Sequence, residues 1–115
     1  MNFYNYNGEP IAYYENESIY LFDGTPVGYF SEDAVYNYDG KHLGWFSNGW
    51  IRDLNGDCVF YSENASGGPV KPVKHIAPIK SVKSIKPVKS VREVKNIRSV
   101  NSLSWSKYYN KDFFE

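Results

Sequence analysis

The sequence has one cysteine, one methionine and no long apolar run, and each scarcity excludes a class of protein. A lone Cys58 makes neither an internal disulfide nor a cysteine-based metal cluster. No stretch of roughly 18 apolar residues is present, so we expect no membrane span and no membrane partner. The N-terminus has no basic region followed by an apolar stretch, so we expect no secretory signal and a cytoplasmic location.

Aromatic residues and glycine are what the 115 residues do contain. Aromatic side chains make up 18% of the chain, eleven of them tyrosines, and nine glycines accompany them. Aromatic residues favour strands and glycine favours turns, so this composition indicates an all-β protein. The length fits a single domain, since domains usually have about 100–150 residues.

A sixteen-residue repeat organises residues 1–64. Its markers are turn-forming pairs at identical spacing: Asn7-Gly8, Asp23-Gly24, Asp39-Gly40 and Asn55-Gly56. Such pairs are the strongest sequence signal for a two-residue type I′ hairpin turn. An isolated hairpin is marginal in water, so we predict four β-hairpins packed side by side in a pseudo-fourfold arrangement.

A two-residue turn would fix the cross-strand pairs. It places Tyr6 opposite Glu9 and Tyr4 opposite Ile11, and the same offsets hold in the other repeats. Glycines then face bulky aliphatic residues in the second and third repeats, which would let neighbouring hairpins approach closely. The polar, mostly acidic segments between hairpins read as solvated loops.

A three-residue repeat follows the Gly/Pro linker at residues 65–69 and continues to residue 104. Its first column is aliphatic without exception: Val70, Val73, Ile76, Ile79, Val82, Ile85, Val88, Val91, Val94, Ile97, Val100 and Leu103. The second column is mostly cationic: Lys71, Lys74, Lys80, Lys83, Lys86, Lys89, Arg92, Lys95 and Arg98. The third column holds small or polar residues.

A period of three fits polyproline II, which has three residues per turn and no internal hydrogen bonds. Residues 70–103 would span about 105 Å in that conformation, at roughly 3.1 Å per residue. A compact chain of this size has a radius of gyration of roughly 13 Å, so the segment must wrap, fold back or reach another chain. We expect it to wrap around the hairpins, burying the aliphatic edge and leaving the lysines in solvent. The aromatic segment 105–115 is expected to dock on the body or on a neighbouring subunit.

These motifs together resemble the bacterial four-fold beta-flower family. The resemblance is carried by the repeated Tyr-x-x-x-Gly units, by Gly-Gly-Pro-x-Lys-Pro from Gly67 to Pro72, and by Lys-Ser and Lys-Pro triplets ending in Ser-Trp-Ser at Ser106. It covers nearly the whole chain and implies a flower of four β-hairpin petals. It implies no activity and no catalytic residue.

Catalytic and metal-binding residues are scarce. The only histidines, His42 and His75, and the only cysteine occupy columns where proline also occurs, so we expect packing roles, no metal and no cofactor. No Ser/His/Asp order, phosphate loop or dinucleotide motif is present, and we predict that the chain is not an enzyme. Arg52 replaces tyrosine in its column and, with His42, is our candidate for a pocket.

Charge divides the chain into two unlike halves. Residues 1–69 hold two bases and ten acids, for a charge of −8, and residues 70–115 hold eleven bases and three acids, for +8. The nine cations of the three-residue repeat are therefore the candidate anion-binding residues, although neutralisation of the acidic half is the interpretation we favour. We predict a non-enzymatic protein-interaction or assembly module, with self-association or a protein partner. The alternative is binding of nucleic acid or another anionic polymer through Lys71 to Arg98.

Overall fold

Eight strands close into a barrel in which every strand pairs antiparallel with the next and the first strand pairs with the last. The computed structural model describes residues 1–115. The strands are β1 (Asn2–Tyr4), β2 (Pro10–Glu15), β3 (Ser18–Leu21), β4 (Pro26–Ser31), β5 (Ala34–Tyr36), β6 (His42–Ser47), β7 (Trp50–Asp53) and β8 (Cys58–Tyr61). The predicted all-β fold of hairpin repeats is confirmed. The one helix, η1 (Lys111–Phe114), is far too short to cross a membrane.

The turns at the Asn-Gly and Asp-Gly pairs differ from the predicted two-residue type. In the first repeat the Gly8 N–H donates to the Asn5 carbonyl at 2.9 Å, and only Gly8 of the Asn-Gly pair has a positive φ, 77°. This is the longer hairpin loop in which a turn is followed by a left-handed glycine and a bulge. The bulge shifts the register, so Tyr4 pairs with Pro10, and the predicted pairing of Tyr4 with Ile11 was wrong.

The tightest turns lie instead in the segments that we read as solvated loops. Between β2 and β3, Asn16 and Glu17 both have positive φ, 51° and 63°, and Glu15 pairs with Ser18. These are the two left-handed residues that a type I′ turn requires. Asparagine tolerates the left-handed conformation, which suits Asn16 to this turn. The loop at Gly8 is longer because it is followed by a bulge.

Glycines on the barrel strands permit close approach, as expected from their place opposite bulky residues. A Cβ on Gly28 would lie 2.8 Å from the carbonyl oxygen of Tyr36 on the neighbouring hairpin. In the fourth repeat the glycine column holds Phe60 instead, and its ring stacks on Phe114 with centroids 5.9 Å apart. The fourth repeat therefore differs from the others in placing an aromatic ring against the C-terminal segment.

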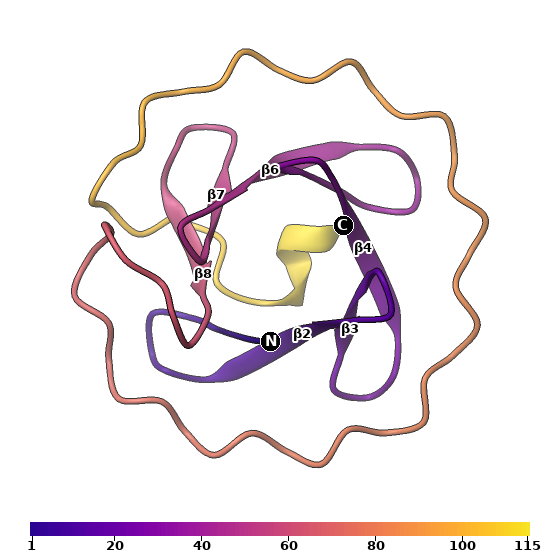
Figure 1. The fold of residues 1–115 in the computed structure, drawn as a ribbon, viewed down its shortest axis with the longest axis horizontal. Helices are drawn as coiled ribbons and strands as arrows, with labels where there is room; N and C mark the ends of the chain where they lie inside the picture. The colour runs from indigo at the N-terminus through magenta and orange to yellow at the C-terminus, as the bar shows by residue number, and fades with distance from the viewer.

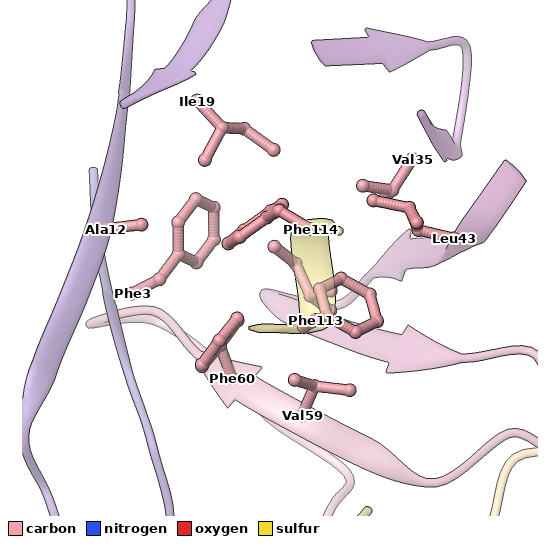
Figure 2. Close-up of a cluster of buried hydrophobic side chains, with 10 residues drawn as sticks. Phe3, Ala12, Ile19, Val35, Leu43, Val59, Phe60, Phe113 and Phe114 are labelled. Carbon is pink, nitrogen blue, oxygen red and sulfur yellow. The ribbon is translucent and has the colours of Figure 1, made fainter. Parts of the chain in front are cut away.

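The C-terminal segment closes the core of the barrel. Figure 2 shows Phe113 and Phe114 of η1 among side chains from the strands, and both are buried. Side chains of Asn5 and Asn37 hold the segment by donating to the carbonyls of Tyr109 and Phe114 at 3.0 and 3.2 Å. Residues 105–115 thus dock on the barrel of their own chain.

Residues 70–103 form an outer ring around the barrel (Figure 1). From residue 70 to residue 102 they belong to no helix or strand. The molecule is a disc of 36 × 36 × 20 Å with a radius of gyration of 13.2 Å. A circle 36 Å wide measures about 113 Å around, close to the roughly 105 Å that 34 residues span in polyproline II. The length of the repeat therefore matches one turn around the barrel.

Candidate functional site

The outer ring (residues 70–103) is the candidate functional site, and the hairpins hold it at regular intervals. Backbone N–H groups of its third column donate to carbonyls at the hairpin turns. Four of these bonds, 2.8–3.1 Å long, recur every nine residues: His75 to Gly8, Ser84 to Gly24, Glu93 to Gly40 and Ser102 to Gly56. Nine ring residues therefore correspond to one sixteen-residue hairpin repeat.

The turn glycines are needed for this contact as well as for their backbone conformation. A Cβ on Gly24, whose φ is +94°, would overlap the carbonyl oxygen of Val82, and Gly8, Gly40 and Gly56 meet the ring in the same way. Each of these four turn glycines therefore marks a point where the ring contacts a hairpin.

Cations of the ring lie over aromatic rings of the barrel. Their side-chain groups lie 4.5, 4.3 and 5.3 Å from the ring centroids in three equivalent pairs: Lys80 with Tyr13, Lys89 with Tyr29, and Arg98 with Trp45. A second set lies at 5.9, 5.6 and 5.7 Å: Lys74 with Tyr4, Lys83 with Tyr20, and Arg92 with Tyr36. A cation within about 6 Å of such a face is attracted to it.

Acidic residues of the hairpins neutralise several of the same cations. Glu15 accepts from both Lys80 and Lys83 at 3.0 Å, and Arg98 donates to Asp33 at 2.7 Å. Hydrogen bonds from Lys83 and then Lys80 lower the pKa of Glu15, and the bond to Glu15 raises the pKa of Lys83. These shifts mean that the charged pair is stabilised in the folded chain.

The remaining cations also turn toward the body. Lys95 lies 4.0 Å from Glu32, whereas Lys71 and Lys86 donate to the backbone carbonyls of Ala65 and Asn16. All nine candidate anion-binding residues therefore have partners within the chain.

The two residues that we named as candidates for a pocket, Arg52 and His42, have different surroundings. Arg52 is buried and satisfied: its guanidinium donates to the carbonyls of Gly56 and Ser102 at 2.8 and 2.6 Å. A cavity of about 260 Å³ beside η1 includes His42 in its lining, together with Asp53 and Tyr108, but not Arg52. The arginine instead fastens the end of the outer ring.

His42 is a buried neutral base. Its Nε2 lies 2.9 Å from the Gly44 carbonyl, and its Nδ1 accepts the Asn96 N–H at 3.1 Å, so the proton resides on Nε2. Burial lowers the pKa of His42, and the Gly44 carbonyl and Glu93 offset this only in part. The backbone N–H of His42 also donates to Glu93 at 2.8 Å. His42 therefore attaches the part of the outer ring around Glu93 and Asn96 to the barrel.

Cys58 is equally enclosed. Burial raises the pKa of its thiol to about 11. Its backbone pairs with the segment around Trp105, with Cys58 N–H donating to Ser104 and Ser106 N–H to Cys58. No three His, Cys, Asp or Glu side chains gather closely enough to hold a metal ion.

The aliphatic column of the outer ring faces solvent, and our expectation that it would be buried was wrong. Its twelve members, here called the aliphatic rim, are 72–96% exposed and run without interruption from Val70 to Leu103. The lysine and arginine side chains that pair with acids are only 27–42% exposed. Lysine side chains are normally more exposed than valine side chains, so the outer ring reverses the usual order of exposure.

The aromatic columns of the barrel explain the reversal. The barrel presents tyrosine faces and carboxylates to the ring, and both attract cations more strongly than aliphatic groups. Burial preference alone did not reveal this orientation. The signal available in the sequence is the departure of Arg52 from the tyrosine column, which is matched by the departure of Asn101 from the cationic column.

Comparison with known proteins identifies one family. The family described as 4-fold beta flower protein matches residues 1–114. That description names a fold and no activity. No curated protein and no solved structure matches the chain.

Proposed function

Since the chain belongs to the 4-fold beta flower family, we propose that it is a non-enzymatic protein-interaction module that serves assembly. The aliphatic rim is its contact surface. The observation that carries this proposal is the exposure of the twelve aliphatic side chains in an unbroken row around the disc.

Such a row is costly unless something covers it. Exposed apolar surface of this kind marks protein interaction sites. Covering one valine, isoleucine or leucine side chain fully contributes about 1.5–3 kcal/mol, and the rim offers twelve of them. Even partial coverage by another polypeptide would therefore be favourable.

The rim is also held ready for contact. The bonds from the outer ring to the hairpin turns recur along its whole length, from His75 to Ser102. A surface that is ordered before binding loses less conformational entropy when a partner arrives. This favours a binding role over that of a loose linker.

Binding of an anionic polymer has weaker support. Lys80 and Lys83 share Glu15, and Lys89 lies over Tyr29, so phosphate groups would compete with partners already in place. The formal net charge of zero also gives no long-range attraction for nucleic acid. Titration with DNA and RNA at two salt concentrations tests this alternative, and salt-sensitive binding at low salt would support it.

Photo-crosslinking tests the proposed contact surface. A photoreactive amino acid replaces Ile85 on the rim, and a matched variant carries it at the neighbouring Ser84, also exposed but outside the rim. We expect the Ile85 variant to form adducts with polypeptides, either with its own purified chain or in a bacterial lysate, and the Ser84 variant to form far fewer. Equal yields at the two positions, or no adducts at either, would contradict the proposal.

A further inference from the structure

We infer that the occupant of the aliphatic rim is a second copy of this chain, placed edge to edge, and that such contacts continue into open planar assemblies. This inference rests on the proposed function of the rim and names its partner. It follows from the spacing, charge and shape of the disc.

Spacing makes the rim complementary to itself. The aliphatic residues recur every third position from Val70 to Leu103, which corresponds to about 9.3 Å per step in polyproline II. Two rims that meet edge to edge present rows of equal period. A shift of half a step places the side chains of one copy in the gaps of the other, and because the period is constant, any arc matches any other.

Charge does not oppose this contact. The cations are turned to the barrel, where Glu15 and Asp33 neutralise some of them, and the rim itself is uncharged. The chain has 13 basic and 13 acidic residues, so two copies have no net repulsion. Proteins with net charge near zero associate more readily than strongly charged ones.

Shape decides the kind of assembly. Two convex discs meet over a short arc, about three rim residues from each, which buries well under the roughly 800 Å² per partner of a stable interface. A single pair is therefore weak. The nine-residue period gives each hairpin three rim residues of its own, for example Val82, Ile85 and Val88, so one disc can hold several neighbours. Contacts that do not close on themselves generate extended assemblies.

The dimensions of the rim do not suit a lipid bilayer. The rim is a single row of side chains on a disc 20 Å thick. The hydrocarbon core of a bilayer is about 30 Å thick, so inserting the rim would also bury polar groups of both faces. A second disc of the same thickness covers the row without that cost.

Sedimentation velocity over a range of concentrations tests the inference on the full chain. The quadrant variant carries Val82→Ser, Ile85→Ser and Val88→Ser, and an all-round variant replaces every rim residue by serine. The matched control carries Ser81→Ala, Ser84→Ala and Ser90→Ala, in the neighbouring column of the same quarter. Thermal unfolding checks that the variants fold, which the exposure of the rim predicts.

We expect the mean mass of the native chain to rise beyond the dimer as concentration approaches about 1 mM, where weak contacts become populated. The control should behave like the native chain, the quadrant variant should give smaller assemblies, and the all-round variant should remain monomeric. The inference is overturned if the native chain stays monomeric throughout, or if the all-round variant assembles as well as the native chain. It is also overturned if a discrete dimer forms that one quadrant variant abolishes. If the native chain stays monomeric but the Ile85 photo-crosslinking variant forms adducts with another protein, the proposed function stands and only the inference of self-association fails. If no adducts form either, the proposed function and the inference both fail.

Discussion

The ammonium of Lys80 lies 4.5 Å from the centroid of the Tyr13 ring. The same relationship joins Lys89 to Tyr29 at 4.3 Å, nine residues further along the outer ring and sixteen further along the barrel. Two repeats of different length are thus held in register by one recurring contact. This contact turns the cations inward and leaves the aliphatic rim outside.

Replacing Lys89 with methionine tests the energy of that contact. Methionine keeps the length of the stem but loses the charge over Tyr29, so we expect a loss of about 1 kcal/mol in the free energy of unfolding. Lys86→Met is the control, since Lys86 donates to the exposed Asn16 carbonyl and lies over no aromatic ring. Urea denaturation measures both, and equal losses would show that the aromatic face contributes nothing.

Gly24→Ala tests whether the turn glycines support the ring. The new Cβ would overlap the Val82 carbonyl, so the ring must shift, and the Ser84 N–H should lose its bond to Gly24 and exchange faster with solvent. Gly67→Ala is the control: its φ is also positive, 77°, but no atom lies within 4 Å of the added Cβ.

The strained backbone alone costs the control about 1–2 kcal/mol of unfolding free energy. Gly24→Ala should cost at least about 1 kcal/mol more, because overpacking adds to the backbone strain. Indistinguishable losses from the two variants would mean that the ring does not rest on this turn.

The hairpin repeats of the barrel could be predicted from the sequence because glycines mark them at constant spacing, and glycine at such positions indicates a turn or a close approach. The glycine columns gave the four hairpins and the close approach at Gly28, and the aromatic content gave an all-β fold. The turn type at Gly8 could not be read from the pair Asn7-Gly8 alone, since a two-residue turn and a bulged loop both use a left-handed glycine.

The orientation of the outer ring could not be predicted from burial preference, because contacts with the barrel override it. One exception in the sixteen-residue repeat and one in the three-residue repeat reflect those contacts. Arg52 stands in the barrel column otherwise held by tyrosine, and Asn101 stands in the corresponding place of the cationic column. A cation is absent from the ring where the barrel already supplies one.

His42 makes the stability of the fold depend on pH. Burial lowers the pKa of His42 in the folded chain below the ordinary 6.5. Below that pH the unfolded chain binds the extra proton and the folded chain resists it, so stability is complete above pH 6.5 and falls as the pH drops toward the lower folded value. Urea denaturation between pH 7.5 and about 5 measures this.

A double variant provides the control for His42. His42→Pro with Glu93→Ser introduces the residues that stand at the equivalent positions of the preceding repeat, Pro26 and Ser84, and removes the donor and acceptor together. The loss of stability just below pH 6.5 should shrink. The loss below about pH 4.5 should remain, because the lowered pKa of Glu15 lets the unfolded chain bind that proton before the folded chain does. An unchanged pH profile would assign the effect to another group.

Cys58 should be inert toward thiol reagents in the folded chain. Its thiol is buried and its pKa is raised to about 11, so little thiolate forms near neutral pH. We expect labelling by a disulfide reagent at pH 8 only as urea unfolds the protein. Rapid labelling without urea would show that the segment around Trp105 opens readily.

The inert Cys58 allows a direct measurement of how the outer ring faces. Single cysteines replace neighbouring ring residues, in Val82→Cys and Lys83→Cys, and maleimide labelling rates are compared under native conditions. Val82 is 93% exposed, whereas the Lys83 side chain is 27% exposed and lies against Glu15. We expect Val82→Cys to be labelled several times faster than Lys83→Cys. Faster labelling of Lys83→Cys would mean that the cations face solvent, and it would contradict the outward aliphatic rim.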